Sequence, residues 1–170
     1  MIHLFQRVPS DLRRYLKYIY DLKKSYGSVL SFVQHERLQW SSDAPSGNPP
    51  FTDPSDYKIL FNDWPYGIDE DVVHLVVWTK FHLEDDPTTD DLTPKARAEI
   101  EEFVDRTFCD VANGGLEKER VIWFKNWRSL KSVHALEHFH VMLYRADKEF
   151  LDKITAGDRP MSEKLNDAET

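Results

Sequence analysis

Cysteine is nearly absent from this chain, which carries one, Cys109, among 170 residues. A single cysteine cannot form a disulfide within the chain, so we expect a reducing, intracellular environment and a cytoplasmic location. Long apolar runs are missing as well: none approaches the length that a membrane-spanning helix needs, and no cleavable targeting segment is visible at Met1. The sequence therefore predicts a protein without a membrane partner.

Positive charge is also in short supply. Lys and Arg number 22 against 30 Asp and Glu, which gives a formal net charge of -8. Since proteins that bind nucleic acids generally carry a basic face, this balance argues against a general nucleic-acid binder. The rest of the composition is ordinary for a globular protein. Hydrophobic residues make up 41% and charged residues 31%, in a chain long enough for one domain with a substantial core.

The spacing of apolar residues predicts an α+β domain. Helical periodicity indicates one helix that begins at Ser10 and a second over about 28–38. A further helix is expected after Thr93 as its cap, stopping at Asn113-Gly114-Gly115. Strands are expected at residues 57–61, 72–80, 120–125 and 136–144. Short turns between the strands, with the helices grouped apart, imply an antiparallel sheet.

These elements divide the chain into three parts within a single domain. A helical extension over residues 1–40 is expected to pack on a core over residues 56–156, with a loop rich in Ser, Pro and Asp between them. From residue 157 the sequence is polar, so we expect a flexible tail over residues 157–170.

Residues 121–145 hold the densest chemistry in the chain. His138 and His140 are separated by one residue, so in a strand both side chains lie on the same face of the sheet. The segment before them is basic and contains Lys125, Arg128 and Lys131. In an acidic protein, three cations beside two imidazoles favour recruitment of an anionic small molecule.

Three long motifs read FNDWPYGIDEDVVHLVVWTKF, DLTPKARAEIEEFV and WFKNWRSLKSVHALEHFHVML, and shorter ones read YGSV and ERLQW. Together they closely resemble the fungal N-acetylglucosamine-induced proteins, and the likeness covers most of the chain. The role of that family is poorly understood, so the resemblance implies family membership without fixing a reaction.

The order of motifs is also similar to that of the histidine-triad superfamily of nucleotide hydrolases and transferases. That fold has a turn with aspartate and proline, a strand of the type H-x-L-V-x-P-K, a helix introduced by L-T-P, and a strand carrying H-x-H-x-H. The matching positions here are Asp63, Pro65, 74–80, Leu92-Thr93-Pro94, Asn126, Ser132, His138 and His140. The resemblance implies a histidine-triad-like antiparallel sheet with helices on one side. Thr79 replaces the proline, and only two of the three strand histidines are present.

Two registers of the histidine motif are open. If the third histidine is the one lost, the set is His138, His140 and Met142, with His140 in the middle as the nucleophile. If the first is lost, the set is Leu136, His138 and His140, with His138 in the middle. We favour His140.

We expect covalent catalysis at phosphorus, in which a neutral imidazole attacks a phosphoryl or nucleotidyl group. The charge that develops needs fixed donors nearby, and His74 is expected to join the histidine cluster. Trp64 and Trp127 are expected to form a wall against a base or sugar ring, and Asp63 to contact a ribose or other hydroxyl. The residues expected at the ligand are Asp63, Trp64, His74, Asn126, Trp127, Arg128, Lys131, Ser132 and His134, and no cofactor is expected.

Two alternatives stay open. His134, His138 and His140 supply three imidazoles, the number in many catalytic zinc sites, so the first alternative is an enzyme that depends on a divalent metal. The flanking cations would repel such an ion, which ranks this alternative second. The other alternative is a binding or sensor protein that keeps the pocket without turnover. Histidine-triad proteins often dimerise, so a homodimer is a further expectation.

Overall fold

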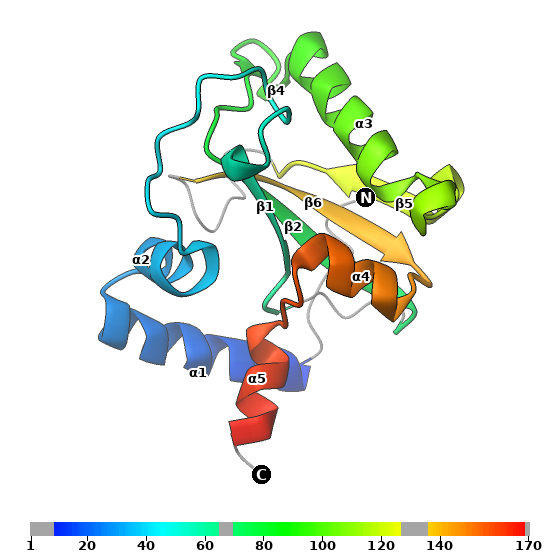
Figure 1. Ribbon diagram of the computed structural model, residues 1–170. Helices are drawn as coiled ribbons and strands as arrows, with labels where there is room; N and C mark the ends of the chain where they lie inside the picture. The colour runs from blue at the N-terminus through cyan, green and yellow to red at the C-terminus, as the bar shows by residue number, and fades with distance from the viewer. Residues whose placement is uncertain (1–8, 65–69, 127–135, 169–170) are drawn as a thin grey trace.

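A four-stranded antiparallel sheet forms the centre of the protein. The structure, a computed structural model, describes residues 9–64, 70–126 and 136–168 (Figure 1). The strands lie in the order β1 (Tyr57–Phe61), β2 (Val72–Thr79), β6 (Glu137–Tyr144) and β5 (Val121–Phe124), and every neighbouring pair is antiparallel. These bounds lie within one residue of the predicted strands, and the expected α+β architecture is confirmed.

Helices and short turns connect the strands and cover them. The α-helices of the described part are α1 (Pro9–Tyr26), α2 (Val29–Phe32), α3 (Pro94–Phe108), α4 (Lys148–Thr155) and α5 (Met161–Ala168). A π-helical turn, η2 (Val33–Leu38), continues α2, and three 3-10 turns are η3 (Pro54–Asp56), η4 (Val111–Asn113) and η5 (Lys118–Arg120). A separate two-stranded ladder joins β3 (Asp85–Asp86) to β4 (Asp91–Leu92). None of the helices in these ranges is long and apolar enough to cross a membrane.

The main core lies on one face of the sheet, between the strands and helices α3 and α4 (Figure 1). Because side chains alternate along a strand, Phe139, Val141 and Leu143 of β6 all point to this face, and all three are fully buried. Helix α3 meets them with an apolar stripe at helical spacing, made of Ala96, Ile100, Phe103, Val104 and Phe108. Burial of each large apolar side chain contributes about 1.5–3 kcal/mol, so this layer fixes the orientation of β6.

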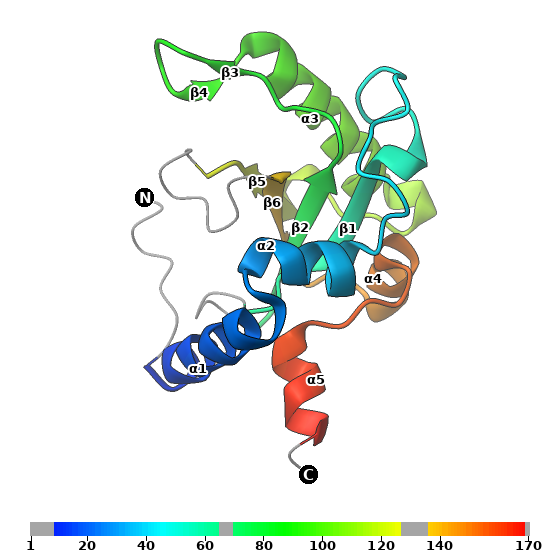
Figure 2. The same cartoon turned by 90° about the vertical axis from the view of Figure 1, so that its left-hand side faces the viewer.

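The N-terminal helices cover the opposite face, which carries the histidines (Figure 2). Leu22 of α1 and Phe32 of α2 are buried in a second apolar cluster with Leu60 of β1, and Trp78 of β2 packs against it. Helices α1 and α2 are therefore anchored on the sheet, and they form a wall over the face that carries the histidines.

Helix α3 begins as predicted and ends earlier than predicted. Thr93 caps its first turn through the side-chain hydroxyl, as expected. The helix ends at Phe108, where the chain turns back and the Leu116 amide donates to the Phe108 carbonyl at 2.8 Å. Gly115 permits this close turn, because a Cβ there would lie 2.7 Å from the Phe108 carbonyl oxygen. The glycines that were expected to stop the helix instead close the turn that follows it.

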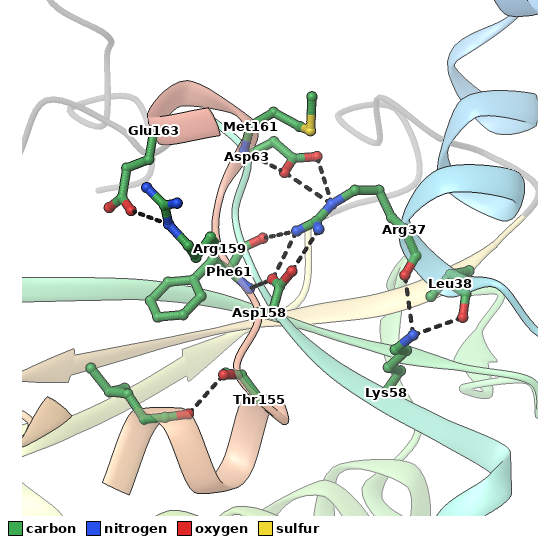
Figure 3. A network of polar contacts seen from close by, with 11 residues as sticks. Arg37, Leu38, Lys58, Phe61, Asp63, Thr155, Asp158, Arg159, Met161 and Glu163 are labelled. Carbon is green, nitrogen blue, oxygen red and sulfur yellow. Dashed lines mark hydrogen bonds and ion pairs between the residues drawn. The ribbon is translucent and has the colours of Figure 1, made fainter. Parts of the chain in front are cut away.

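The C-terminal segment differs from the flexible tail that the sequence predicts over residues 157–170. Helix α5 occupies Met161–Ala168. The Met161 amide donates to Asp63 Oδ1 at 3.0 Å, and the Ser162 amide donates to the Asp63 carbonyl at 3.1 Å. Asp158 forms a buried ion pair with Arg37 (Figure 3). The polar composition misled the prediction because these polar groups bind one another inside the protein.

Candidate functional site: an imidazole cluster under the N-terminal helices

Three buried imidazoles meet on the helix-covered face of the sheet. His138 and His140 of β6 share this face, as their separation in the sequence predicts, and the register places Trp78 opposite His138 and Val76 opposite His140. His74 of β2 reaches the same cluster, with its Nε2 2.9 Å from Nδ1 of His140. The structure therefore brings together the three histidines that were expected to meet.

His140 is held by hydrogen bonds at both ring nitrogens. Nδ2 of Asn126 lies 3.2 Å from Nε2 of His140. Because an amide N–H can only donate, Nε2 accepts, and the proton of the neutral His140 ring sits on Nδ1, where it is donated to His74 Nε2. Nδ2 of Asn62 also approaches His74 Nε2, at 3.3 Å. Both ring nitrogens of His140 are thus hydrogen-bonded within the protein.

His140 is neutral at physiological pH. Burial lowers its pKa well below the ordinary value of 6.5, and the neighbouring His74 and His138 lower it further. Its ring also stacks on Phe124, with ring centroids 4.9 Å apart and 12° between the planes. A neutral ring held in this way is suited to positioning its neighbours.

The lowered pKa of His140 makes stability depend on pH. In the unfolded chain this histidine binds a proton near pH 6.5, whereas in the folded protein it binds one only at lower pH. Protonation therefore favours the unfolded chain. The contribution of His140 to stability is complete above pH 6.5 and is lost as the pH falls from there toward its folded pKa. We expect the free energy of unfolding, measured by urea denaturation, to fall by up to about 1.4 kcal/mol per pH unit in that window.

The substitution His140→Gln tests this prediction through the pH slope rather than through absolute stability. The variant should lose the part of the slope that lies below pH 6.5. His35→Gln removes an exposed histidine and serves as the control for the substitution itself. An unchanged slope in His140→Gln would contradict the prediction.

His138 is oriented by a backbone hydrogen bond. Its Nδ1 lies 2.9 Å from the carbonyl oxygen of Leu136, which can only accept, so Nδ1 carries a proton. When the ring is neutral, its lone pair is therefore on Nε2. Trp78 packs beside the ring with a centroid distance of 4.6 Å, and the His140 ring lies 5.5 Å away at 78°. These contacts fix one orientation of a ring whose basic atom is Nε2.

A cavity of about 370 Å³ lies between the sheet and the N-terminal helices, and His138, His140 and Asn126 line its sheet side. The helical side is mostly aromatic and apolar, with two cations, and its lining residues are Tyr15, Tyr18, Ile19, Leu22, Lys23, Val29, Phe32, Val33 and Arg37. The cavity therefore has a polar end at the imidazoles and an apolar end under α1 and α2.

Asp63 and Trp64 line the same cavity in different ways. Trp64 is buried, and its ring lies 6.2 Å from Tyr15 and 5.4 Å from Tyr18, so it stands in the cavity wall. Its predicted contact with a base or sugar ring stays a prediction. Asp63 was predicted to contact a ligand hydroxyl. Instead, Nε of Arg37 lies 3.0 Å from Asp63 Oδ1 and 3.2 Å from Oδ2. The carboxylate is bound by the protein's own arginine.

Arg37 is the centre of a buried ion cluster beside the cavity (Figure 3). Its Nη1 and Nη2 bind the two carboxylate oxygens of Asp158 at 2.6 and 2.8 Å. The Phe61 amide donates to the same carboxylate at 2.9 Å. Burial opposes the charge of Arg37, but the ion pairs with Asp158 and Asp63 outweigh it and raise the pKa. Burial also raises the pKa of Asp63, which Arg37 partly offsets.

The basic loop predicted beside the histidines is described at one position only. Lys125 is directed to the acidic β3–β4 ladder, where its Nζ pairs with Asp85 and lies 3.9 Å from Glu137 Oε2. Lys125 therefore belongs to another ion cluster. The other predicted positions, Trp127, Arg128, Lys131, Ser132 and His134, lie outside the described residues, and their roles stay predictions.

Within residues 9–64, 70–126 and 136–168, no three His, Cys, Asp or Glu side chains are arranged so that they could hold a metal ion together. In this part of the chain both nitrogens of His140 and Nδ1 of His138 are used in hydrogen bonds, which does not favour metal coordination. The alternative metal set of His134, His138 and His140 includes a residue outside these ranges, so it too stays a prediction.

Sequence reasoning missed the helical half of the site. Tyr18 and Lys23 of α1 and Arg37 of η2 all line the cavity, and none of them was expected there. Periodicity located the helices, but it does not say which other element their inner faces meet. The sequence carried no signal that could have assigned these residues to the histidines.

Comparison with known proteins identifies the family. The family described as "Protein of unknown function (DUF3605)" matches residues 1–144, which include the three imidazoles, Arg37 and Asp63. The chain belongs to this family. Membership of DUF3605 assigns no reaction to the chain, because the family description names none.

Two fungal relatives confirm the resemblance noted from the motifs. N-acetylglucosamine-induced protein 1 of Candida albicans is 33% identical over 135 residues, which are 76% of this chain and 52% of that protein. The uncharacterized protein YPL067C of Saccharomyces cerevisiae is 30% identical over 132 residues, 75% of this chain and 66% of that protein. This DUF3605 chain therefore spans about half the length of the first relative and just under two thirds of the second.

A solved structure supports the architecture. The crystal structure of HTC1 matches with a TM-score of 0.61 and 25% sequence identity, covering 91% of this chain and 88% of that one. The match supports the mixed arrangement of helices and antiparallel strands. None of these comparisons tests the resemblance to the histidine-triad superfamily, which stays a prediction.

Proposed function

We propose that this DUF3605 protein is a hydrolase or transferase that acts on a phosphorylated or nucleotide-like small molecule, with His138 as its nucleophile. The observation that carries the proposal is the orientation of His138. Its Nδ1 is tied to the Leu136 carbonyl, so the lone pair of the neutral ring is on Nε2, in a side chain that lines a cavity. A nucleophilic histidine needs a fixed tautomer of this kind.

We do not assign the attack to His140, which the sequence alone favoured. Both nitrogens of His140 are engaged, by His74 and by Asn126, so attack through either one would first break a buried hydrogen bond. This geometry supports the register in which Leu136, His138 and His140 occupy the three positions of the motif. In that register His140 is a positioning residue for the ring beside it.

The proposed reaction has two steps. Nε2 of His138 attacks phosphorus, a P–N bond forms, and the bond to the leaving group breaks as that group departs with the electron pair and takes up a proton. Water or the hydroxyl of a second substrate then attacks the same phosphorus and releases a proton, which balances the one that the leaving group took up. The P–N bond breaks, its electron pair returns to Nε2, and the imidazole regains its neutral form. The amide of Asn126, beside His140, is a suitable donor to the phosphoryl oxygens during both steps.

The shape of the cavity supports a ligand with a ring system. Its polar end is formed by imidazole and amide groups with Trp78 beside His138, whereas Trp64 and Tyr18 stand elsewhere in the wall. Aromatic walls of this kind hold flat apolar groups by stacking and by exclusion of water.

A homodimer and a cytoplasmic location stay predictions.

The test is turnover. The protein is incubated with nucleoside phosphoramidates, dinucleoside polyphosphates and nucleotide sugars, and release of a nucleoside monophosphate is followed by chromatography. We expect release with at least one of these classes. We also expect a phosphorus adduct on His138 when the reaction is quenched in alkali and the protein is analysed by mass spectrometry. Binding without release would support the sensor alternative and refute the enzyme.

A further inference from the structure

Helix α1 places a cation in the wall of the histidine cavity. Lys23 lies in the last turn of α1, is exposed to solvent, and lines the cavity together with His138 and His140. We propose that Lys23 is the residue that draws an anionic substrate into this cavity and binds its charge. This inference rests on the proposed function and names a residue and a charge requirement for it.

Arg37, the other described cation in the cavity wall, is already paired with carboxylates of the protein. Arg37 binds two carboxylates, those of Asp158 and Asp63, and its side chain is almost completely buried. One guanidinium facing two carboxylates adds no net positive potential to the cavity. Arg37 therefore holds the fold together and leaves no charge for a ligand.

The imidazole end of the cavity supplies no compensating charge through His140. Burial keeps this ring neutral at physiological pH, and the chain as a whole carries a formal net charge of -8. An anion that approaches such a protein is repelled unless a local cation offsets the field. Lys125, the described member of the basic loop, is bound to Asp85 instead.

Lys23 can offer a positive charge to a ligand, which Arg37, His140 and Lys125 cannot. None of the ion pairs within the described ranges involves Lys23, so its ammonium group is available to a ligand. Its backbone carbonyl is fixed at the end of α1, where the Gly27 amide donates to it at 2.9 Å. The side chain therefore extends from a fixed position on the helix. The N-terminal extension is in this way part of the binding site as well as its cover.

The neighbouring residue provides a matched control. Lys24 lies beside Lys23 on α1, is also exposed, and does not line the cavity. Lys23→Glu and Lys24→Glu change the net charge by the same amount and on the same helical turn, so they differ only in position. Any difference between them measures the local role of Lys23.

The experiment combines binding and turnover. Binding of a nucleoside monophosphate is followed through tryptophan fluorescence, and KM and kcat are measured on the substrate class that turns over. Lys23→Glu should raise Kd and KM roughly tenfold at low salt and leave kcat within about twofold, because a partly solvated charge acts on binding more than on chemistry. The gap should shrink toward twofold at about 0.5 M salt, since exposed charges are screened. Lys24→Glu should stay within about twofold of the parent protein throughout.

Each outcome bears on a separate statement. Equal effects of the two substitutions would overturn the role of Lys23 and leave the proposed reaction standing. Selective loss of binding in Lys23→Glu, in a protein that turns nothing over, would uphold Lys23 and refute the enzyme. A parent protein that binds no nucleoside monophosphate and no inorganic phosphate at millimolar concentration would overturn both.

Discussion

Replacing His138 with alanine should reduce turnover of a phosphorus-centred substrate by on the order of 10⁴-fold, to near the uncatalysed level. The reason is chemical: the substitution removes the only protein atom that forms a bond to phosphorus in the proposed mechanism. The side chain lies on the cavity face of β6 while the main core lies on the other, so the fold should persist. Release of nucleoside monophosphate, with the urea midpoint as a check on folding, measures the effect.

His140→Ala is the matched comparison on the same strand. His140 positions its neighbours through His74 and Asn126, and misplacement of a reacting group costs about 10²-fold, so this loss should be smaller. Free imidazole in the buffer should partly rescue His138→Gly and should not rescue His140→Gly. If His140→Ala is the more damaging change, or if imidazole rescues His140→Gly and not His138→Gly, the nucleophile is His140 and the other register of the motif applies.

Arg37→Met should destabilise the protein by about 3–5 kcal/mol. The substitution leaves the carboxylates of Asp63 and Asp158 without their cation in a site where the Arg37 side chain is 4% exposed and that of Asp158 is 9% exposed. Water cannot replace the lost partner there, so each carboxylate must bind a proton or force the segment open. Urea denaturation at neutral pH gives the change in the free energy of unfolding.

Two variants distinguish burial from simple charge loss. Lys148→Met breaks the ion pair with Asp152, in which the Lys148 side chain is 87% exposed and that of Asp152 is 49% exposed. This substitution should lower the free energy of unfolding by less than about 1 kcal/mol. The double substitution of Arg37→Met with Asp158→Asn removes one stranded carboxylate together with its partner, and should recover part of the lost stability. A cost below about 1 kcal/mol for Arg37→Met itself would show that the cluster is solvated and contributes little.

Much of the fold follows from the sequence because strands and helices have local signatures. Alternation of side chains placed His138 and His140 on one face of β6, and the run of apolar residues in β2 is typical of the interior position that this strand occupies in the sheet. Thr93 before Pro94 marked the start of α3 for the same local reason.

The site could be predicted only in part because its other half is assembled from distant segments. Arg37 and Asp158 are separated by 121 positions in the chain, and no periodic pattern relates them. The choice between His138 and His140 depended on one hydrogen bond to the Leu136 carbonyl, which is a property of backbone geometry and leaves no trace in residue types. Asp63 was assigned to the ligand, and Lys125 to the cations that recruit it, although Asp63 is paired with Arg37 and Lys125 with Asp85.

The ion cluster around Arg37 also sets an order of events during synthesis. Arg37 and Asp63 leave the ribosome long before Asp158, and closing a loop of this length carries an entropic cost that grows with the logarithm of its size. Until Asp158 arrives, the nascent chain holds an arginine with one carboxylate partner instead of two. The ion pair that holds Arg37 in the cavity wall is thus completed late, after the strands that carry the histidines have been translated.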